Sequence, residues 1–562
     1  MERIKTQLKE QVTMNKNKTK WIFAATLLLA TACASDDTTQ TGEQKNEPNT
    51  KGYTTFVAGK ESTQTRTSLD YDTGNFFWES GDNIFVKDDA GIWQTGSNAV
   101  SGTEKSYYKF LLSGAFAGTS YTVFYPGKNG TNDQVTIATA QTQATPADTK
   151  HLGEAGDCGI GTATGSSAGF GFKLNHKAAI LVFQPYTNDA LLKDCYLTKI
   201  EVISDNNIAG TYTLDPITKK LTGSGASNTI TLNTIGTGAY SNGFPMTNTS
   251  ANLSTNGAYM VIAPGHHKLR IRYWLMSPTE LYLVGSGLMA HPGPLEGTIT
   301  RDLPIFNYEE NNYYDMRADL KVAHYPISNQ YYLWDAQQEF WYGHESDQPM
   351  ENMMGDAPES LYPQNNSDPR WYNEAVFPAT ASHSAATCPN VNELCWYVQD
   401  GDPHWDNNTL WATGGHLTKG GMWLKTQTKI AAANGKNVAD LKIAAPDGID
   451  HTTSTAPAQV SNSLIASDMP DANNMNNYFY LPALGQYGKS GGNIVFMQNG
   501  YLGYYWSSTP APSPVNCAYS IGFTNYTISV AGSGTAQSNN RSSAFRLWKA
   551  DDSDGKYRPI GM

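Results

Sequence analysis

The sequence predicts a mainly β protein with two successive antiparallel β-sandwiches, followed by a separate, loop-rich domain that mixes helix and strand. Alternation of apolar and polar residues, not helical spacing, dominates from about residue 53 to residue 320. Short apolar runs in this stretch are bounded by Gly, Asn, Asp or Pro, as is typical of strands in a sandwich. From about residue 326 the sequence becomes rich in tryptophan and in residues typical of loops, and nine of the 13 tryptophans lie beyond that point. This change predicts a domain boundary.

The N-terminus carries an export signal. Three lysines, Lys16, Lys18 and Lys20, precede an apolar run from Trp21 to Leu29, which ends in Ala30-Thr31-Ala32-Cys33. The run is shorter than the roughly 20 apolar residues that a bilayer requires, so residues 1–33 are interpreted as a signal peptide. Small residues before Cys33 resemble a bacterial lipobox, which implies that Cys33 is lipidated, with palmitate or a similar acyl chain. The alternative is an ordinary secretory signal in which this cysteine is incidental.

Residues 34–51 are predicted to form a disordered tether. They consist almost entirely of Thr, Gln, Asn, Glu, Lys and Asp, from which no core can form. Asp36 and Asp37 follow the cysteine closely, and acidic residues at this place resemble the surface-export signal of Bacteroidales-type lipoproteins. The resemblance implies a lipid-anchored protein on the outer face of the outer membrane.

Composition limits the class of partner. The net charge of -12 argues against nucleic acid, whose phosphates require a basic face. Five of the six cysteines remain once Cys33 is used for lipid, and an odd number cannot form a complete set of disulfides. The close pair Cys388 and Cys395 is predicted to be a disulfide or two buried thiols, not a zinc site. The pairing of Cys158, Cys195 and Cys517 is left open.

The two sandwiches are predicted over residues 52–187 and 188–322. Apolar runs mark the strands of the first at 53–57, 84–86, 107–111, 121–125, 135–137, 170–174 and 178–183. After a polar break, further runs mark the second at 197–202, 209–214, 259–264 and 269–273. Trp78 is expected in the core, and Gly81-Asp82 is expected to form a turn. The glycine-rich segment Gly159–Gly165 lacks the spacing of a nucleotide-binding loop and is expected to be a flexible turn.

Four motifs in order resemble the fimbrillin-like family of Bacteroidales, which comprises Mfa-like lipoprotein pilins. They are Thr65-Arg66-Thr67-Ser68-Leu69, Phe77-Trp78-Glu79-Ser80-Gly81-Asp82-Asn83-Ile84, Tyr125-Pro126 and Leu174-Asn175-His176-Lys177-Ala178-Ala179. The resemblance implies that both sandwiches are transthyretin-like. It also implies assembly by strand exchange, in which a protease removes a terminal strand and a strand from another fimbrial subunit replaces it. Arg66 is the first candidate cleavage site, with Lys60 and Lys51 as competitors, and the alternative for Arg66 is a solvated loop residue.

The stretch 326–562 is predicted to be a third domain that binds a ligand. Its motifs Leu481-Pro482-Ala483-Leu484-Gly485, Gly503-Tyr504-Tyr505-Trp506-Ser507-Ser508-Thr509 and Arg558-Pro559-Ile560 resemble the Fibrobacter major paralogous domain. That resemblance implies a lectin-like fold related to C-type lectins, acting as an adhesin. Large aromatic side chains can serve as stacking platforms for a glycan, so five are candidate binding residues: Trp405, Trp411, Tyr504, Tyr505 and Trp506.

Signals for catalysis and for metal or cofactor binding are missing from the sequence. It contains no HExxH, GxSxG or Walker motif. His383, His404 and His416 follow the cysteine pair without a zinc-ligand pattern. Asp551-Asp552-Ser553-Asp554-Gly555 imitates a calcium loop, but Ala550 replaces the first acidic ligand of an EF-hand. We therefore expect no enzyme, no cofactor and no metal, although looser calcium coordination is left open.

Three functions fit this sequence. The first is a fimbrial subunit, incorporated in a fimbria after cleavage and located at its tip, because an additional globular domain replaces the strand that a polymerising subunit would donate. The second is a non-polymerising outer-membrane lipoprotein that binds a host or dietary glycan or a protein receptor. The third is an enzyme acting on surface polysaccharide, which would need converging carboxylates that sequence order does not reveal.

Overall fold

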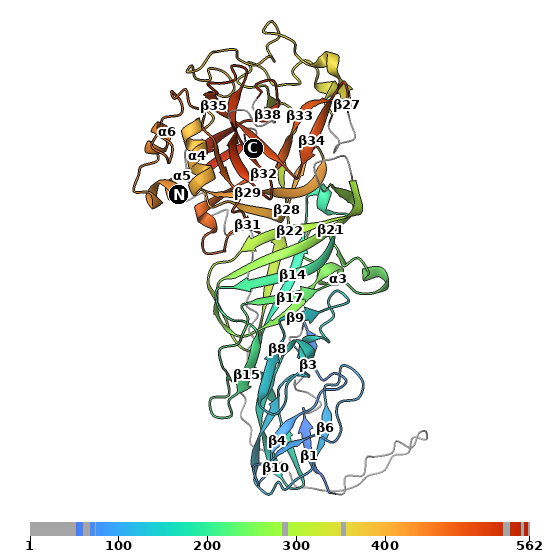
Figure 1. Ribbon diagram of the computed structural model, residues 1–562. Coiled ribbons are helices and arrows are strands. Elements are labelled where there is room, and N and C mark those ends of the chain that lie inside the picture. The colour runs from blue at the N-terminus through green and yellow to red at the C-terminus, as the bar shows by residue number, and fades with distance from the viewer. Residues whose placement is uncertain are drawn as a thin grey trace. The chain divides into compact units, whose positions relative to one another are not determined.

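The protein is described here by a computed structural model over residues 52–59, 68–72, 75–283, 290–349, 356–531, 540–551 and 556–559 (Figure 1). The chain forms two compact units. The N-terminal unit comprises Met1–Tyr186, Leu197–Ile271 and Asp302–Asp319, and the C-terminal unit comprises Thr187–Tyr196, Arg272–Arg301 and Leu320–Met562. Strands make up most of the regular structure in both units, so the predicted mainly β fold is confirmed.

One sheet of the N-terminal unit contains eight strands, in the order β5-β4-β7-β10-β11-β1-β6, with β12 paired to β10. Their bounds are β1 (Thr54–Ala58), β4 (Phe85–Lys87), β5 (Trp93–Thr95), β6 (Tyr108–Leu112), β7 (Ser120–Tyr125), β10 (Gly159–Ser166), β11 (Gly169–Phe172) and β12 (Leu174–His176). Apolar residues of these strands share one core, to which Phe56, Phe110 and Val123 contribute together with Trp78. A two-stranded ribbon of β2 (Ser68–Asp70) and β3 (Asn75–Phe77) precedes Trp78.

The remaining strands of this unit form smaller groups. Strand β13 (Ala179–Tyr186) pairs antiparallel with β19 (Ala258–Ile262) and parallel with β24 (Asn312–Asp319). Its central position explains its nearly continuous apolar sequence, because both of its faces are covered. The other elements are β8 (Gln134–Ile137), β9 (Ala140–Thr142), α2 (Leu152–Ala155), β14 (Tyr196–Ser204), β15 (Gly210–Leu214), β16 (Leu221–Thr222), β17 (Thr229–Asn233), β18 (Phe244–Pro245), α3 (Leu253–Asn256), β20 (Gly265–His267) and β23 (Phe306–Tyr308).

Both stretches predicted as sandwiches, 52–187 and 188–322, contribute strands to the N-terminal unit. Strand β8 pairs with β15, and β9 pairs with β17, so strands from the two stretches pair directly with one another. Two long strands, β21 (Leu269–Leu283) and β22 (Ala290–Asp302), begin or end in the N-terminal unit and continue into the C-terminal unit.

The prediction of a flexible turn at Gly159–Gly165 is wrong. This segment is strand β10, which pairs with β7, β11 and β12. Its glycines serve close packing between backbones: a Cβ atom on Gly161 would lie 2.1 Å from the carbonyl oxygen of Lys173. Glycine is therefore required by the approach of a neighbouring strand, which composition alone does not distinguish from a turn.

The C-terminal unit contains a nine-stranded sheet in the order β27-β34-β33-β35-β36-β37-β30, with β38 paired to β35 and β26 paired to β38. A second group pairs in the order β32-β29-β28, with β25 and β31 also beside β28. The bounds are β25 (Ala323–Tyr325), β26 (Tyr331–Tyr332), β27 (Asp356–Pro358), β28 (His404–Thr413), β29 (His416–Lys425), β30 (Val460–Asn462), β31 (Ala466–Ser467), β32 (Tyr478–Pro482), β33 (Leu484–Ser490), β34 (Asn493–Asn499), β35 (Gly503–Pro510), β36 (Ala518–Phe523), β37 (Ile528–Ala531), β38 (Phe545–Arg546), β39 (Trp548–Asp551) and β40 (Lys556–Pro559).

Three helices lie together in this unit: α4 (Val391–Asp400), α5 (Gln427–Ala433) and α6 (Asp440–Ile443) (Figure 1). Helix α4 begins with a capping box, in which the Asn390 side chain accepts from the Glu393 backbone and the Glu393 carboxylate accepts from the Asn390 backbone. Its residues up to Val398 are buried against the sheet. Within the described part of the chain, no helix combines the length and apolar character that crossing a membrane would require.

Candidate functional site

Strand β1 is the feature of the N-terminal unit that a strand-exchange mechanism would use. It lies between two strands, antiparallel to β6 with Phe56 opposite Phe110, and parallel to β11 with Phe56 opposite Phe170. Phe56 and Ala58 point into the core and are fully buried. The Phe56 ring stacks on Phe170 at 5.0 Å and meets Phe116 edge-on at 5.1 Å. Five residues thus supply both backbone pairing and a central part of the core.

The predicted processing and lipidation sites flank this strand along the chain. Cys33, Lys51, Lys60 and Arg66 all lie outside the described residues, so these sites stay predictions. Within the described part, Gly52 and Gly59 bracket β1 and both have positive φ angles, 95° and 83°. The strand is therefore bounded at each end by a backbone conformation that favours glycine.

The predicted turn at Gly81-Asp82, which follows Trp78, is confirmed and is stabilised by a buried carboxylate. Gly81 has a φ of 90°, and Asp82 accepts from the Glu79 backbone N–H at 2.6 Å. The Tyr125 hydroxyl donates to the other oxygen of Asp82 at 2.8 Å. Trp78 itself is fully buried, as expected, and packs edge-on against Phe110 and Tyr125.

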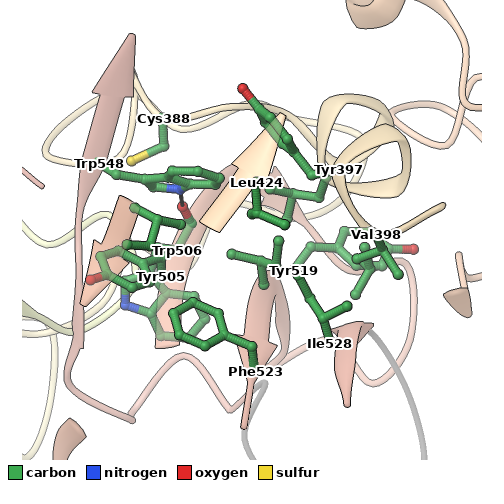
Figure 2. Packing of buried hydrophobic residues seen from close by; sticks show 14 of the residues in the cluster. Cys388, Tyr397, Val398, Leu424, Tyr505, Trp506, Tyr519, Phe523, Ile528 and Trp548 are labelled. Carbon is green, nitrogen blue, oxygen red and sulfur yellow. Dashed lines mark hydrogen bonds between the residues drawn. The ribbon is translucent and has the colours of Figure 1, made fainter. Parts of the chain in front are cut away.

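The five aromatic residues predicted to bind a ligand do not form an exposed platform, which corrects that prediction. Trp411, Tyr505 and Trp506 are fully buried, and Trp405 is only 8% exposed. Tyr504 is half-buried and stacks on Phe545 with 4.6 Å between ring centroids. Figure 2 shows Tyr505 and Trp506 packed in the core beside Trp548 and Phe523. The rings of Trp411, Tyr505 and Trp506 fill the core, so a ligand cannot reach these three residues.

The polar atoms of these rings are also used inside the protein. The Trp411 indole donates to the Gly420 carbonyl at 3.1 Å, and the Trp506 indole donates to the Tyr332 carbonyl at 2.8 Å. The Tyr505 hydroxyl donates to the Pro482 carbonyl at 2.7 Å, and burial raises the pKa of Tyr505 well above its usual range. These residues are structural.

Cys388 and Cys395 are free and buried, so no disulfide joins them. Of the two alternatives drawn from the sequence, the structure contains the pair of buried thiols. Burial raises the pKa of each thiol to about 12, which keeps it protonated and unreactive at neutral pH. Cys158 and Cys195 are likewise free and buried, and Cys517 is free and half-buried.

The three histidines near the cysteine pair have separate partners. A ring nitrogen of His383 lies 3.6 Å from Asp335, one of His404 lies 3.8 Å from Asp402, and one of His416 lies 3.2 Å from Glu280. Among the residues that the structure describes, no three His, Cys, Asp or Glu side chains gather as metal ligands. Residues 552–555 of the calcium-like segment lie outside that part of the chain.

A polar pocket in the C-terminal unit was not anticipated from the sequence. Its volume is about 340 Å³, and its lining combines two adjacent aromatic residues with carboxylates, amides and one imidazole: Asp335, Gln337, Asn366, Ser367, Asp368, Pro369, Trp371, Tyr372, Asn373, Glu374, Ala375 and His383. Most of these residues belong to one irregular loop. The sequence signal for it is the Trp371-Tyr372 pair embedded between Asn366-Ser367-Asp368 and Asn373-Glu374.

Within the pocket, Trp371 is fixed on two sides. Its ring stacks on Tyr372 with 4.4 Å between centroids, and its indole N–H donates to one oxygen of Glu374 at 3.0 Å. The other oxygen of Glu374 accepts from the Asn366 amide at 3.1 Å. The lining therefore holds an aromatic ring beside a carboxylate that is exposed to solvent.

Buried charged side chains hold the pocket loop in place. The fully buried Asp335 carboxylate accepts four hydrogen bonds, from the backbones of Ser382, His383 and Ala385 and from the Asn373 amide, at 2.7–3.0 Å. The Arg541 guanidinium donates to the carbonyls of Asn373 and Ala375 at 2.7 and 2.9 Å. Both side chains position the loop, and neither places a positive charge in the lining of the pocket.

A second arginine, Arg370, acts on the neighbouring part of the same loop. It donates to both oxygens of Asp368, with Nη2 to Oδ2 at 2.7 Å, and to the Phe340 carbonyl at 3.1 Å. Burial alone would raise the pKa of Asp368, but the hydrogen bonds and charge of Arg370 outweigh burial and lower it. Asp368 is therefore ionised and already paired.

No protein-family model matches this sequence, and no curated protein matches it. Solved structures match part of the chain. A provisional cell adhesion protein of Bacteroides ovatus is 15% identical, with 47% of this chain and 91% of that chain covered and a TM-score of 0.27. A fimbrial assembly protein of Parabacteroides distasonis is 14% identical, with 47% and 90% covered and a TM-score of 0.24. The fimbrial anchor protein Mfa2 of Porphyromonas gingivalis is 8% identical, with 40% and 78% covered and a TM-score of 0.18. Similarity at this level assigns no function to the present chain.

Proposed function

We propose that this chain is a lipid-anchored cell-surface subunit of a fimbria, which accepts a strand from another subunit in place of β1 and uses its C-terminal unit for adhesion. The observation that carries the proposal is the place of β1 in its sheet. Strand β1 is short and lies near a stretch rich in candidate cleavage sites, yet it pairs on both sides and inserts Phe56 into the core.

Removal of β1 would leave two strand edges unsatisfied at once. Its neighbours β6 and β11 would then be separated by a gap one strand wide, because neighbouring strands in a sheet lie about 5 Å apart. The cavity left by Phe56 would expose Phe170 and Phe116 to water. A gap of this kind strongly favours insertion of another strand with an apolar residue at the matching position, which is the physical basis of β-augmentation.

The anchor and the surface location rest on the sequence. The lipobox-like residues before Cys33, followed by a polar tether, support acylation and display outside the cell. The proposed place at the fibre tip is supported by the presence of the C-terminal unit, a compact unit separate from the one that contains β1. We propose binding, not catalysis, as the activity of this protein.

The test is strand uptake by the chain from Ala34 to Met562. Limited trypsin treatment is expected to release a short N-terminal peptide, and Arg66→Ala, Lys60→Ala and Lys51→Ala variants assign the cut. A fluorescent synthetic peptide with the sequence of residues 50–60 is then added, and fluorescence anisotropy measures its binding. The same peptide with Phe56→Asp is the matched control, because it keeps the backbone and loses the buried ring.

Uptake of the native peptide only after cleavage, and no uptake of the control peptide, is the expected result. Cleavage without uptake, or a β1 segment that resists release, would contradict the acceptor role. Either outcome would favour the solitary glycan-binding lipoprotein as the function.

A further inference from the structure

The pocket around Trp371 is built as a rigid site although its loop contains no long helix or strand. Three buried charged residues hold it: Asp335 is fully buried, Arg541 is 1% exposed, and Arg370 is 6% exposed. Asp335 has a φ of 51°, a conformation that few non-glycine residues adopt. Its four hydrogen bonds maintain this conformation. Burial of a charged side chain costs free energy unless the charge is paired. The presence of three such side chains behind one pocket therefore indicates that the shape of this pocket serves a function.

The charges that line the pocket limit what it can bind. No Lys or Arg belongs to the lining, whereas Asp335, Asp368 and Glu374 do. Phosphorylated, sulfated and carboxylated ligands are therefore disfavoured. Asp335 and Asp368 are already saturated by donors from the protein, so they add little attraction for a cation.

The groups that remain available to a ligand are hydrogen-bonding groups next to an aromatic ring. Each oxygen of the exposed Glu374 carboxylate accepts one bond from the protein and has capacity for more. Among the described residues, Gln337 makes no side-chain hydrogen bond that would occupy its amide. Trp371 contributes an aromatic ring whose position is fixed by Tyr372 and Glu374. Acceptors, amides and a fixed indole match a ligand with several hydroxyl groups and an apolar face.

We propose that this pocket binds an uncharged sugar residue, whose C–H face stacks on Trp371 and whose hydroxyls donate to Glu374 and to the amide oxygens of Asn366 and Gln337. The volume of about 340 Å³ lies within the range of small-ligand pockets. The inference rests on the adhesive function proposed above, to which it gives a site and a ligand class.

The experiment uses saturation-transfer difference NMR on the chain from Ala34 to Met562. The probes are neutral sugars, namely glucose, galactose, mannose, fucose and N-acetylglucosamine, each added separately. N-acetyl-lysine methyl ester is added as a cationic probe, since an aromatic ring beside a carboxylate can also hold an ammonium group. At least one neutral sugar is expected to give a signal on its ring protons.

Variants locate the binding to this pocket. Trp371→Ala is expected to weaken sugar binding about tenfold, as loss of a stacking hot spot does. Glu374→Ala is expected to weaken it severalfold, whereas Trp371→Phe retains a ring and most of the affinity. Tyr526→Ala, which removes an exposed aromatic residue outside the pocket, is the matched control and is expected to leave binding unchanged.

Two results would overturn the inference: no neutral sugar binds the wild-type chain while the lysine probe does, or sugar binding persists unchanged in Trp371→Ala and Glu374→Ala. Peptide uptake is measured on the same variants. Because β1 and the pocket belong to different units, intact strand uptake with lost sugar binding separates failure of this inference from failure of the proposed assembly function.

Discussion

The two units of this protein hold their polypeptide in place by different means. In the N-terminal unit, short strands pair through their backbones, and aromatic and aliphatic side chains share the cores. In the C-terminal unit, long irregular segments are held by buried polar and charged side chains, of which Asp335, Arg370 and Arg541 are the best examples. Under the functions proposed above, the first kind of structure would allow exchange of a strand, and the second kind would hold a loop in a shape that fits a ligand.

The two units should therefore be sensitive to different substitutions. Loss of a buried apolar ring from the core around Phe56 and Phe110 should destabilise the N-terminal unit, because the ring leaves a cavity. Loss of a buried hydrogen-bonding side chain should damage the C-terminal unit, because the carbonyls that it satisfied become unpaired in the interior.

The largest effect is expected for Trp78→Ala. Trp78 is fully buried between Phe110 and Tyr125, so its loss leaves a large cavity and should lower the free energy of unfolding by about 3–5 kcal/mol. Hydrogen–deuterium exchange during urea titration reports each unit separately. The C-terminal unit should retain its urea midpoint, and an equal shift in both units would show that their cores are not independent.

A slightly smaller effect is expected for Arg541→Leu in the C-terminal unit. Its guanidinium donates to the carbonyls of Cys517, Asn373 and Ala375, and their loss of partners should cost about 3 kcal/mol. The same exchange measurement should show the destabilisation in the pocket loop. Arg541→Lys keeps the charge but not the planar fork and should recover part of the loss; a stability equal to wild type in Arg541→Leu would show that the loop does not depend on this residue.

A third prediction compares two glycines in neighbouring strands. Gly161→Ala should cost about 2 kcal/mol, because the new Cβ would meet the Lys173 carbonyl oxygen at 2.1 Å. Gly171→Ala is the matched control, since nothing lies within 4 Å of its Cβ position, and its effect should be below about 1 kcal/mol. Thermal denaturation of both variants distinguishes close packing of β10 from a general requirement for flexibility; equal costs would remove the packing explanation.

The smallest effect is expected for the pH dependence of the stability of the N-terminal unit. Burial lowers the pKa of His267 and of His151, both in the N-terminal unit. The unfolded chain then takes up protons before the folded state does, so stability should fall as the pH drops below about 6.5. His267→Gln should make the pH dependence of the N-terminal unit shallower between about pH 7 and about pH 5. An unchanged slope in urea titrations would show that His267 titrates normally.

Sequence and structure agree where short apolar runs mark the strands. The strands around Phe56, Phe110 and Val123 follow from such runs, and the turn at Gly81 follows from its glycine and aspartate. The sequence does not predict strand β10, because its glycines pack against a backbone and a glycine-rich sequence is the same for such packing and for a turn. The close approach of a neighbouring backbone depends on the tertiary fold, which the identity of a single residue does not reveal.

The candidate site was less predictable than the fold. Tryptophan and tyrosine occur both in cores and in binding surfaces, so composition could not show that Trp506 is buried while Trp371 lines a pocket. What separates them is the context along the chain: Trp506 lies in a strand whose residues are mostly buried, whereas Trp371 lies among Asn, Asp and Ser in an irregular loop. The partners that hold that loop, Asp335 and Arg541, are far from it in sequence.

The most direct test of the strand-exchange account is a reversible lock on β1. Val57 and Lys109 lie opposite each other on β1 and β6, so Val57→Cys with Lys109→Cys can be oxidised to a disulfide that retains the strand. After trypsin treatment, uptake of the fluorescent peptide of residues 50–60 is measured before and after reduction, with the single variant Val57→Cys as control. The account predicts no uptake while the lock is closed and full uptake once it is reduced. Equal uptake in both states would contradict it, because the peptide would then bind somewhere other than the place of β1.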